Sequence, residues 1–252
     1  MLVEPAAVMR AQLPVFREVS PEGEFDVVRF PEFQSIASIP EGTKLNRLKV
    51  RQDPHGDADG VLGMPWFADR VWLFDYLGER LMFAAGDEFR PSADHTCTLG
   101  FLTDANGVRQ ISFPRIQATV DGETIDFLFD TGATLLLSDE AMKTLNDELP
   151  QTRGASFITN SIFETWSTRH PDWLVIDNAD TLLNESIIRV PIVRVGGYDV
   201  GPVWFTRRAD RHLIYFSQWM DKPVNGALGG SVFKYFSIFV DYPKALAQFK
   251  VK

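Results

Sequence analysis

The chain has 252 residues, of which 45% are apolar and 23% charged, which is ordinary for a globular protein with a sizeable core. Its formal net charge of -9 argues against a nucleic-acid-binding protein, which normally presents a basic face. A single cysteine, Cys97, excludes an internal disulfide, and no apolar run reaches the ~20 residues of a membrane span.

The first ten residues, Met1–Arg10, lack a basic region followed by an apolar core, so we do not expect them to act as a signal peptide. The sequence leaves the compartment open. We expect a periplasmic or secreted protein if a signal peptide precedes this chain, and a cytoplasmic one otherwise.

An internal repeat links residues 59–83 to residues 225–249 at a constant offset of 166 residues, the spacing between Gly60 and Gly226. Seven of the 25 aligned positions are identical without a gap. Residue frequencies predict only about one or two identities by chance. The agreement indicates an internal duplication.

Each copy of the repeat predicts a short helical turn followed by a hairpin of two strands. Asp75 and Asp241 recur at the ends of equivalent strands, and we interpret both as structural residues. The predicted strands are Val71–Tyr76 and Glu79–Ala84 in the first copy, and Ser237–Tyr242 and Leu246–Val251 in the second.

Residues 85–110 are rich in Gly, Pro, Asp and Asn, a composition typical of turns and loops. We interpret this segment as the connection between two lobes. The predicted organisation is then a partial first lobe at 1–84, the connection at 85–110 and a complete second lobe at 111–252.

The second lobe opens with a predicted hairpin. Arg115–Val120 alternates in polarity, Asp121-Gly122 is a strong two-residue turn signal, and Thr124–Phe129 runs back as the partner strand. The hairpin leads directly into Asp130, which therefore lies at a strand end.

Beyond that point the pattern stays mainly β with a few short helices. Leu135–Leu137 predicts a short strand, and Ser138 is placed to cap a helix over 139–145. Ile187–Val195 and Val203–Thr206 predict further strands, with Pro and Gly between and around them.

Asp130, Thr131 and Gly132 suit a site in which a carboxylate activates water. The glycine allows close backbone approach and donates its N–H to the carboxylate, while the threonine hydroxyl is placed to bond a facing loop. Two carboxylates about 3 Å apart share one proton. The ionised one takes a proton from water, and the protonated one donates to the carbonyl oxygen of the scissile bond.

The run Leu128–Thr134, followed later by Ala227-Leu228-Gly229, resembles a lobe of the retropepsin-like and pepsin-like aspartic proteases. In those families an apolar-apolar-Gly segment threads beside the Asp-Thr-Gly loop, and Val61-Leu62-Gly63 is the corresponding segment of the first repeat. The resemblance implies a mainly β acid-protease fold, with one complete lobe and the latter part of a second, duplicated lobe.

For function, the resemblance implies an aspartic endopeptidase that acts on peptide or protein substrates without a cofactor. It makes Asp130 the catalytic residue. Thr131, Gly132, Leu228 and Gly229 would support the catalytic loop.

The chain departs from the family pattern because it has one Asp-Thr-Gly, whereas the chemistry requires two aspartates. At the repeat offset, the partner of Asp130 would lie upstream of Met1. Three explanations stay open: a truncated first lobe, a homodimer that brings two copies of Asp130 together, or a catalytically inactive binding or scaffold protein.

The other candidate residues favour structural roles. Ser231 lacks the frame of a nucleophile elbow and is interpreted as a helix cap. Arg207 and Arg208 are expected to pair with Asp199 or Asp210 at the surface. Four histidines show no paired spacing of the kind that binds zinc, so we expect no metal site: His55, His95, His170 and His212.

Overall fold

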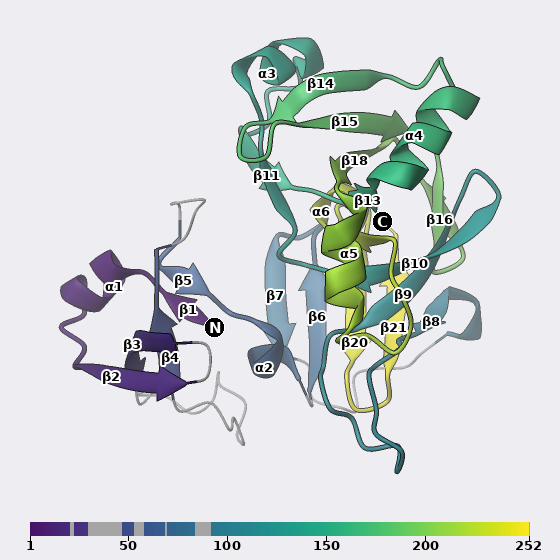
Figure 1. Ribbon diagram of the computed structural model, residues 1–252. Coiled ribbons are helices and arrows are strands. Elements are labelled where there is room, and N and C mark those ends of the chain that lie inside the picture. Colours follow the sequence, from purple (N-terminus) through teal and green to yellow (C-terminus); the bar gives the residue numbers. More distant parts are fainter. Residues whose placement is uncertain (21–22, 30–46, 53–57, 69, 84–91, 252) are drawn as a thin grey trace. The chain divides into compact units, whose positions relative to one another are not determined.

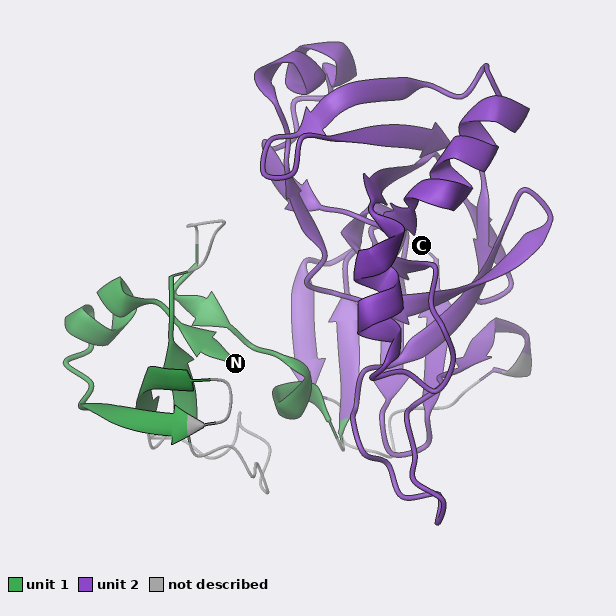
Figure 2. Ribbon diagram, viewed as in Figure 1, with its two compact units in different colours: residues 1–70 green, residues 71–252 purple. Residues whose placement is uncertain are grey.

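The computed structural model describes residues 1–20, 23–29, 47–52, 58–68, 70–83 and 92–251. It divides into two compact units, Met1–Arg70 and Val71–Lys252 (Figure 2). None of the helices in these ranges has the length and apolar character that crossing a membrane requires. The predicted division at residues 84 and 110 stays a prediction.

Unit 1 is built on a small five-stranded sheet in the order β2-β3-β4-β1-β5. Its buried cluster contains Val3, Val8 and Val28. The elements are β1 (Leu2–Val3), α1 (Pro5–Arg10), β2 (Val15–Ser20), β3 (Gly23–Arg29), β4 (Arg47–Val50), β5 (Gly60–Val61) and α2 (Met64–Phe67).

Unit 2 contains a nine-stranded sheet in the order β14-β15-β18-β13-β19-β10-β9-β16-β17 (Figure 1). The predicted mainly β architecture is confirmed. The strands are β9 (Arg115–Val120), β10 (Glu123–Phe129), β13 (Phe157–Thr159), β14 (Val175–Asp180), β15 (Glu185–Val190), β16 (Val193–Val195), β17 (Tyr198–Val200), β18 (Val203–Arg208) and β19 (Gly226–Leu228).

The hairpin of β9 and β10 forms as predicted. Val120 pairs with Glu123, and the two residues between them, Asp121 and Gly122, have φ values of 52° and 77°. Positive φ at both central residues is the turn geometry that favours Asp-Gly, and it matches the twist of the two strands. The hairpin therefore delivers Asp130 to the end of a paired strand.

The remaining elements of unit 2 surround this sheet. The predicted helix α3 begins at Asp139, and the Ser138 Oγ accepts a hydrogen bond from the Ala141 N–H at 3.2 Å, so the predicted cap is confirmed. The elements are β11 (Thr134–Leu136), α3 (Asp139–Leu145), β12 (Thr152–Gly154), α4 (Asn160–Arg169), α5 (Asp210–Ser217) and α6 (Gly230–Phe233).

A second sheet in unit 2 has the order β7-β6-β20-β21-β8, and Figure 1 shows these strands side by side. The 3-10 helix η2 precedes β8 within the predicted connection, and β8 pairs with β21. The elements are β6 (Val71–Asp75), β7 (Arg80–Phe83), η2 (Ala93–His95), β8 (Thr96–Thr98), β20 (Ser237–Asp241) and β21 (Leu246–Lys250).

The structure places the same elements at the same offset in both copies of the repeat. Helix α2 starts at Met64 and α6 at Gly230, and β6 and β20 start at Val71 and Ser237, in each case 166 residues apart. The prediction of a helical turn followed by a hairpin is confirmed for both copies. Their origin in a duplicated lobe stays a prediction.

Pairing between β6 and β20 gives this sheet a local two-fold symmetry. Leu73 pairs with Phe239, its own repeat equivalent, and Val71 pairs with Asp241 on one side as Asp75 pairs with Ser237 on the other. Exchanging the two copies of the repeat therefore gives the same residue pairs between β6 and β20. The four strands β7, β6, β20 and β21 form two equivalent hairpins that pair through β6 and β20.

Aromatic side chains join the two sheets of unit 2. The Phe129 ring on β10 lies 4.6 Å from the Phe233 ring on α6 and 6.4 Å from the Phe74 ring on β6, measured between centroids. All three side chains are buried. This packing fixes the end of β10, and with it Asp130, above the five-stranded sheet.

Candidate active site

Asp130 directly follows β10, where the strand gives way to a tight loop. β19 runs parallel to the end of β10, with Phe129 opposite Leu228. The Asp130 N–H donates to the Leu228 carbonyl oxygen at 2.8 Å. The expected approach of Ala227, Leu228 and Gly229 to the Asp130 loop is confirmed, and the supporting role of Leu228 and Gly229 in catalysis stays a proposal.

The loop holds the Asp130 carboxylate by backbone donors. The Gly132 N–H donates to Asp130 Oδ1 at 3.0 Å. Burial, which penalises the charged form, raises the pKa of Asp130, while the amides of Gly132 and Ala133 act in the opposite direction. Burial therefore favours the protonated form of this half-buried carboxyl more than that of an exposed aspartate.

Thr131 is half-buried beside the carboxylate. Within the described ranges, no hydrogen bond of its hydroxyl is seen. The neighbouring Thr134 Oγ1 instead donates to the Gly132 carbonyl oxygen at 3.0 Å and so bonds across the loop. The predicted bond from Thr131 to a facing loop stays a prediction.

Gly229 lies where no other residue fits. A Cβ atom at this position would meet the carbonyl oxygens of Ala155 and Asp130 and the methyl group of Ala133. The glycine is therefore required by the close crossing of β19 and the Asp130 loop, and not by an unusual backbone conformation.

Two buried serines hold the other side of this crossing. The Gly229 N–H donates to Ser156 Oγ at 3.0 Å, and Ser231 Oγ lies 2.8 Å from both Ser156 Oγ and the Trp204 carbonyl oxygen. The prediction that Ser231 caps a helix is wrong. The N-cap of α6 is Gly229, and Ser231 lies one residue inside the helix, where its hydroxyl points into the core.

Tyr76 also reaches this region, which the sequence did not predict. Its ring lies 5.8 Å from the ring of Phe233, and burial together with the charge of Asp130 raises the pKa of its phenol. The recurrence of tyrosine at Tyr76 and Tyr242 in the repeat was the only signal in the sequence.

A second carboxylate is not seen beside Asp130 in the part of the chain that the structure describes: the groups that act on its pKa are backbone amides. Asp75 and Asp241 instead have matching structural roles. Each accepts a hydrogen bond from the backbone N–H three residues later, at 3.1 Å from Gly78 and 2.9 Å from Lys244. This is the role the sequence predicted for them.

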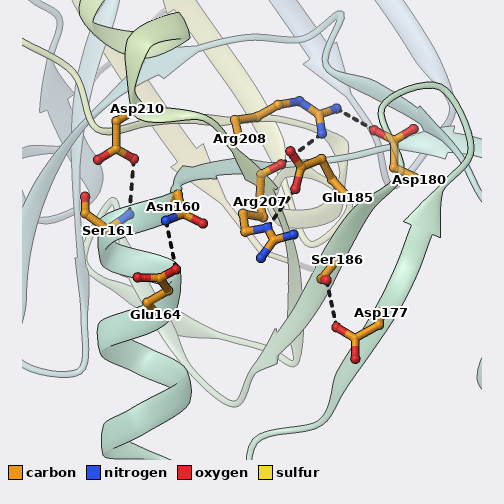
Figure 3. Close-up of polar contacts among 10 residues, drawn as sticks. All are labelled: Asn160, Ser161, Glu164, Asp177, Asp180, Glu185, Ser186, Arg207, Arg208 and Asp210. Carbon is orange, nitrogen blue, oxygen red and sulfur yellow. Dashed lines mark hydrogen bonds and ion pairs between the residues drawn. The ribbon is translucent and has the colours of Figure 1, made fainter.

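Arg207 and Arg208 form ion pairs on another part of the nine-stranded sheet (Figure 3). Arg207 Nε lies 2.7 Å from a Glu185 carboxylate oxygen, and Arg208 Nη2 lies 2.8 Å from Asp180 Oδ2. The Arg208 and Asp180 side chains are nearly fully buried.

The predicted partners of these arginines, Asp199 and Asp210, are wrong. Asp199 pairs with Arg194 across the hairpin of β16 and β17, and Asp210 accepts a hydrogen bond from the Ser161 N–H at 3.1 Å (Figure 3). β18 pairs with β15, which brings its arginines to acidic residues distant in sequence.

Two histidines of the described ranges, His95 and His170, have structural neighbours, and His212 is exposed. His95 stacks on Tyr198 at 4.0 Å between centroids, and His170 stacks on Trp173 and lies 2.9 Å from Asp121 Oδ2. His55 lies outside the described residues. No group of three potential metal ligands is found among the residues that were placed.

Comparison with known proteins finds no matching family model and no matching curated protein. One similar solved structure is a retropepsin-like aspartic protease from Rickettsia conorii, with a TM-score of 0.33 and 14% sequence identity. The match covers 64% of this chain and 94% of that one. It is too distant to support a conclusion about fold or chemistry.

Proposed function

We propose that the chain is an aspartic-type peptide hydrolase in which Asp130 activates a water molecule. The observation that carries the proposal is the placement of Asp130. Asp130 directly follows a paired strand, its backbone N–H donates to the Leu228 carbonyl oxygen, and its carboxylate accepts the Gly132 N–H. Thr131, Gly132, Leu228 and Gly229 support the loop in this proposal.

The proposed chemistry is general acid–base hydrolysis without a covalent intermediate. A second carboxylate beside Asp130 would share its proton, so that one group takes a proton from water while the other donates to the peptide carbonyl oxygen. The raised pKa of Asp130 favours the protonated form that one member of such a pair requires. No cofactor takes part in the proposal.

We propose a second copy of the chain as the source of the other carboxylate, as Asp130 of a homodimer. Residues 111–252 would then act as the complete lobe, and 1–84 would be the latter part of a duplicated one. The substrate would be an extended peptide or protein segment.

A catalytically inactive binding or scaffold protein is the second candidate function. The observation that favours it is that the part of the chain described by the structure places no carboxylate beside Asp130. Such a protein would keep the lobe and its loop but would not hydrolyse peptides.

The two candidates are separated by an assay with quenched fluorescent peptides between about pH 3 and pH 7. Asp130→Asn keeps the size and hydrogen bonding of the side chain but removes the titratable group, so the rate should fall by several orders of magnitude. Asp172→Asn, at an exposed aspartate, is the matched control. Hydrolysis that survives Asp130→Asn would place the chemistry elsewhere.

Dilution tests the source of the second carboxylate. In a homodimer the specific activity should fall as the chain is diluted below its dissociation constant, and sedimentation should show dissociation over the same range. An active monomer would contradict the homodimer. A correctly folded chain without activity at any concentration would favour the binding protein.

A further inference from the structure

The two flanks of the symmetric sheet are not equivalent. On one side, β8 covers the outer edge of β21, with Leu246 opposite Thr98 and Gln248 opposite Thr96. The local two-fold relation maps that edge onto the outer edge of β7. In the described part of the chain, no strand pairs there, so β7 presents unpaired N–H and C=O groups.

Exposure of the side chains follows the same asymmetry. Leu81 and Phe83 on β7 are 47% and 49% exposed. Their repeat equivalents on β21, Ala247 and Phe249, are 0% and 1% exposed. The β7 edge thus combines free backbone groups with apolar side chains, a combination that favours pairing with another strand.

A hollow of about 320 Å³ lies against the same hairpin and is lined by Phe74, Asp75, Tyr76, Glu79, Arg80 and Leu81. Phe74, Tyr76 and Leu81 give it an apolar wall. Arg80 is held at its rim because Nη2 lies 2.6 Å from Asp75 Oδ2. The hollow is of the size and character that accepts an apolar side chain of a bound chain.

We propose that the outer edge of β7 is a binding site for an extended polypeptide segment with alternating apolar residues. The segment would add to the sheet as an antiparallel strand beside Arg80, Leu81 and Met82, the positions equivalent to those that β8 pairs with on β21. One of its apolar side chains would enter the hollow. Main-chain hydrogen bonds would provide affinity, and the hollow would provide selectivity.

This proposal does not depend on hydrolysis at Asp130, although Tyr76 lines the hollow and also lies near Asp130. A binding-only protein and a protease would both use such an edge to recruit an unfolded or extended segment of a partner. The internal precedent is β8 on the equivalent edge, which shows the register that an added strand takes on this sheet.

The test uses a fluorescein-labelled peptide, Lys-Thr-Val-Thr-Val-Thr-Lys, and fluorescence polarisation with the full chain. We expect saturable binding with a Kd of about 1 mM or tighter. The same peptide with N-methyl groups on alternate residues keeps its side chains but loses main-chain donors, so it should bind at least about tenfold more weakly. Equal binding of the two peptides would overturn the proposal.

Protein variants test the position of the site. Leu81→Lys should weaken binding at least about tenfold, because the charge meets the apolar side chain of the added strand. Ile192→Lys replaces an exposed apolar residue between β15 and β16, and it should leave the Kd unchanged. Circular dichroism confirms that both variants fold.

Three further outcomes would count against the proposal. Unchanged binding by Leu81→Lys, or no binding of the unmodified peptide, would show that β7 does not accept this partner. A dimer that Leu81→Lys converts to a monomer would show that a second copy of the chain occupies the edge instead.

Discussion

Replacing Gly229 by alanine tests whether the close crossing of β19 and the Asp130 loop holds the site together. The added Cβ would meet the Ala155 and Asp130 carbonyl oxygens and the Ala133 methyl group at once. Overpacking of a buried position costs about 1–3 kcal/mol. Because two of the three obstacles are backbone atoms, we expect a loss of about 3 kcal/mol or more.

Urea denaturation followed by tryptophan fluorescence measures this loss, and thermal unfolding should show a Tm lower by about 6–12 °C. Gly132→Ala is the control within the same loop, since its Cβ would approach only Asp130 Oδ1, at an ordinary contact distance of 3.5 Å. We expect it to cost less than about 1 kcal/mol. Equal losses for the two variants would refute the argument that packing at Gly229 fixes the loop.

Three other predictions concern the groups around the site. Ser156→Ala should lower the free energy of unfolding by about 1–3 kcal/mol, because the buried Gly229 N–H loses its acceptor; a urea titration that shows no loss would contradict this. Asp130→Asn should stabilise the chain increasingly from acid to neutral pH, because burial raises the pKa of Asp130 and the ionised form opposes folding; a difference in Tm that stays constant with pH would disprove it. Hydrogen bonds from Ser237 and then Arg80 lower the pKa of Asp75. The ionised carboxylate therefore stabilises the folded chain above the unfolded pKa of 3.8, and this stabilisation is lost as the pH falls through the folded pKa. Asp75→Asn should therefore flatten the acid limb of a plot of Tm against pH, and an unchanged acid limb would count against this role.

The parts of the fold that the sequence predicts well depend on residues close together in the chain. Asp121-Gly122 forms its turn because both residues adopt positive φ, and Ser138 caps α3 through a donor three residues away. Such signals depend on contacts between near neighbours in the sequence, so they do not depend on the tertiary arrangement. They are also why Asp130 could be located at a strand end.

Helix α4, Asn160–Arg169, shows the opposite case. Its Ser, Thr and Ile residues are weak helix formers, and its N-cap makes no side-chain hydrogen bond. Burial of Phe163 and Trp166 stabilises the helix, and Trp166 lies 5.4 Å from Phe205 on β18. Tertiary packing outweighs local preference here, so the sequence alone does not predict the element.

Non-local pairing also explains what the sequence misses at the site. Tyr76 reaches the neighbourhood of Asp130 because β6 pairs with β20, a contact across most of the chain. β8 lies in a segment of turn-rich composition and forms a strand because β21 offers it an edge. Neither arrangement produces a pattern among neighbouring residues, so neither can be predicted from the sequence alone.

The pairing of β6 with β20 sets an order of events during synthesis. A ribosome that adds about 5–20 residues per second needs roughly 8–33 s to travel from Leu73 to its partner Phe239, 166 residues later. Through that interval the apolar strand Val71–Asp75, buried along its whole length in the finished sheet, has no β20 to pair with. The nascent chain therefore exposes an aggregation-prone segment until β20 emerges, so expression should benefit from slower initiation or from chaperones that shield extended apolar segments.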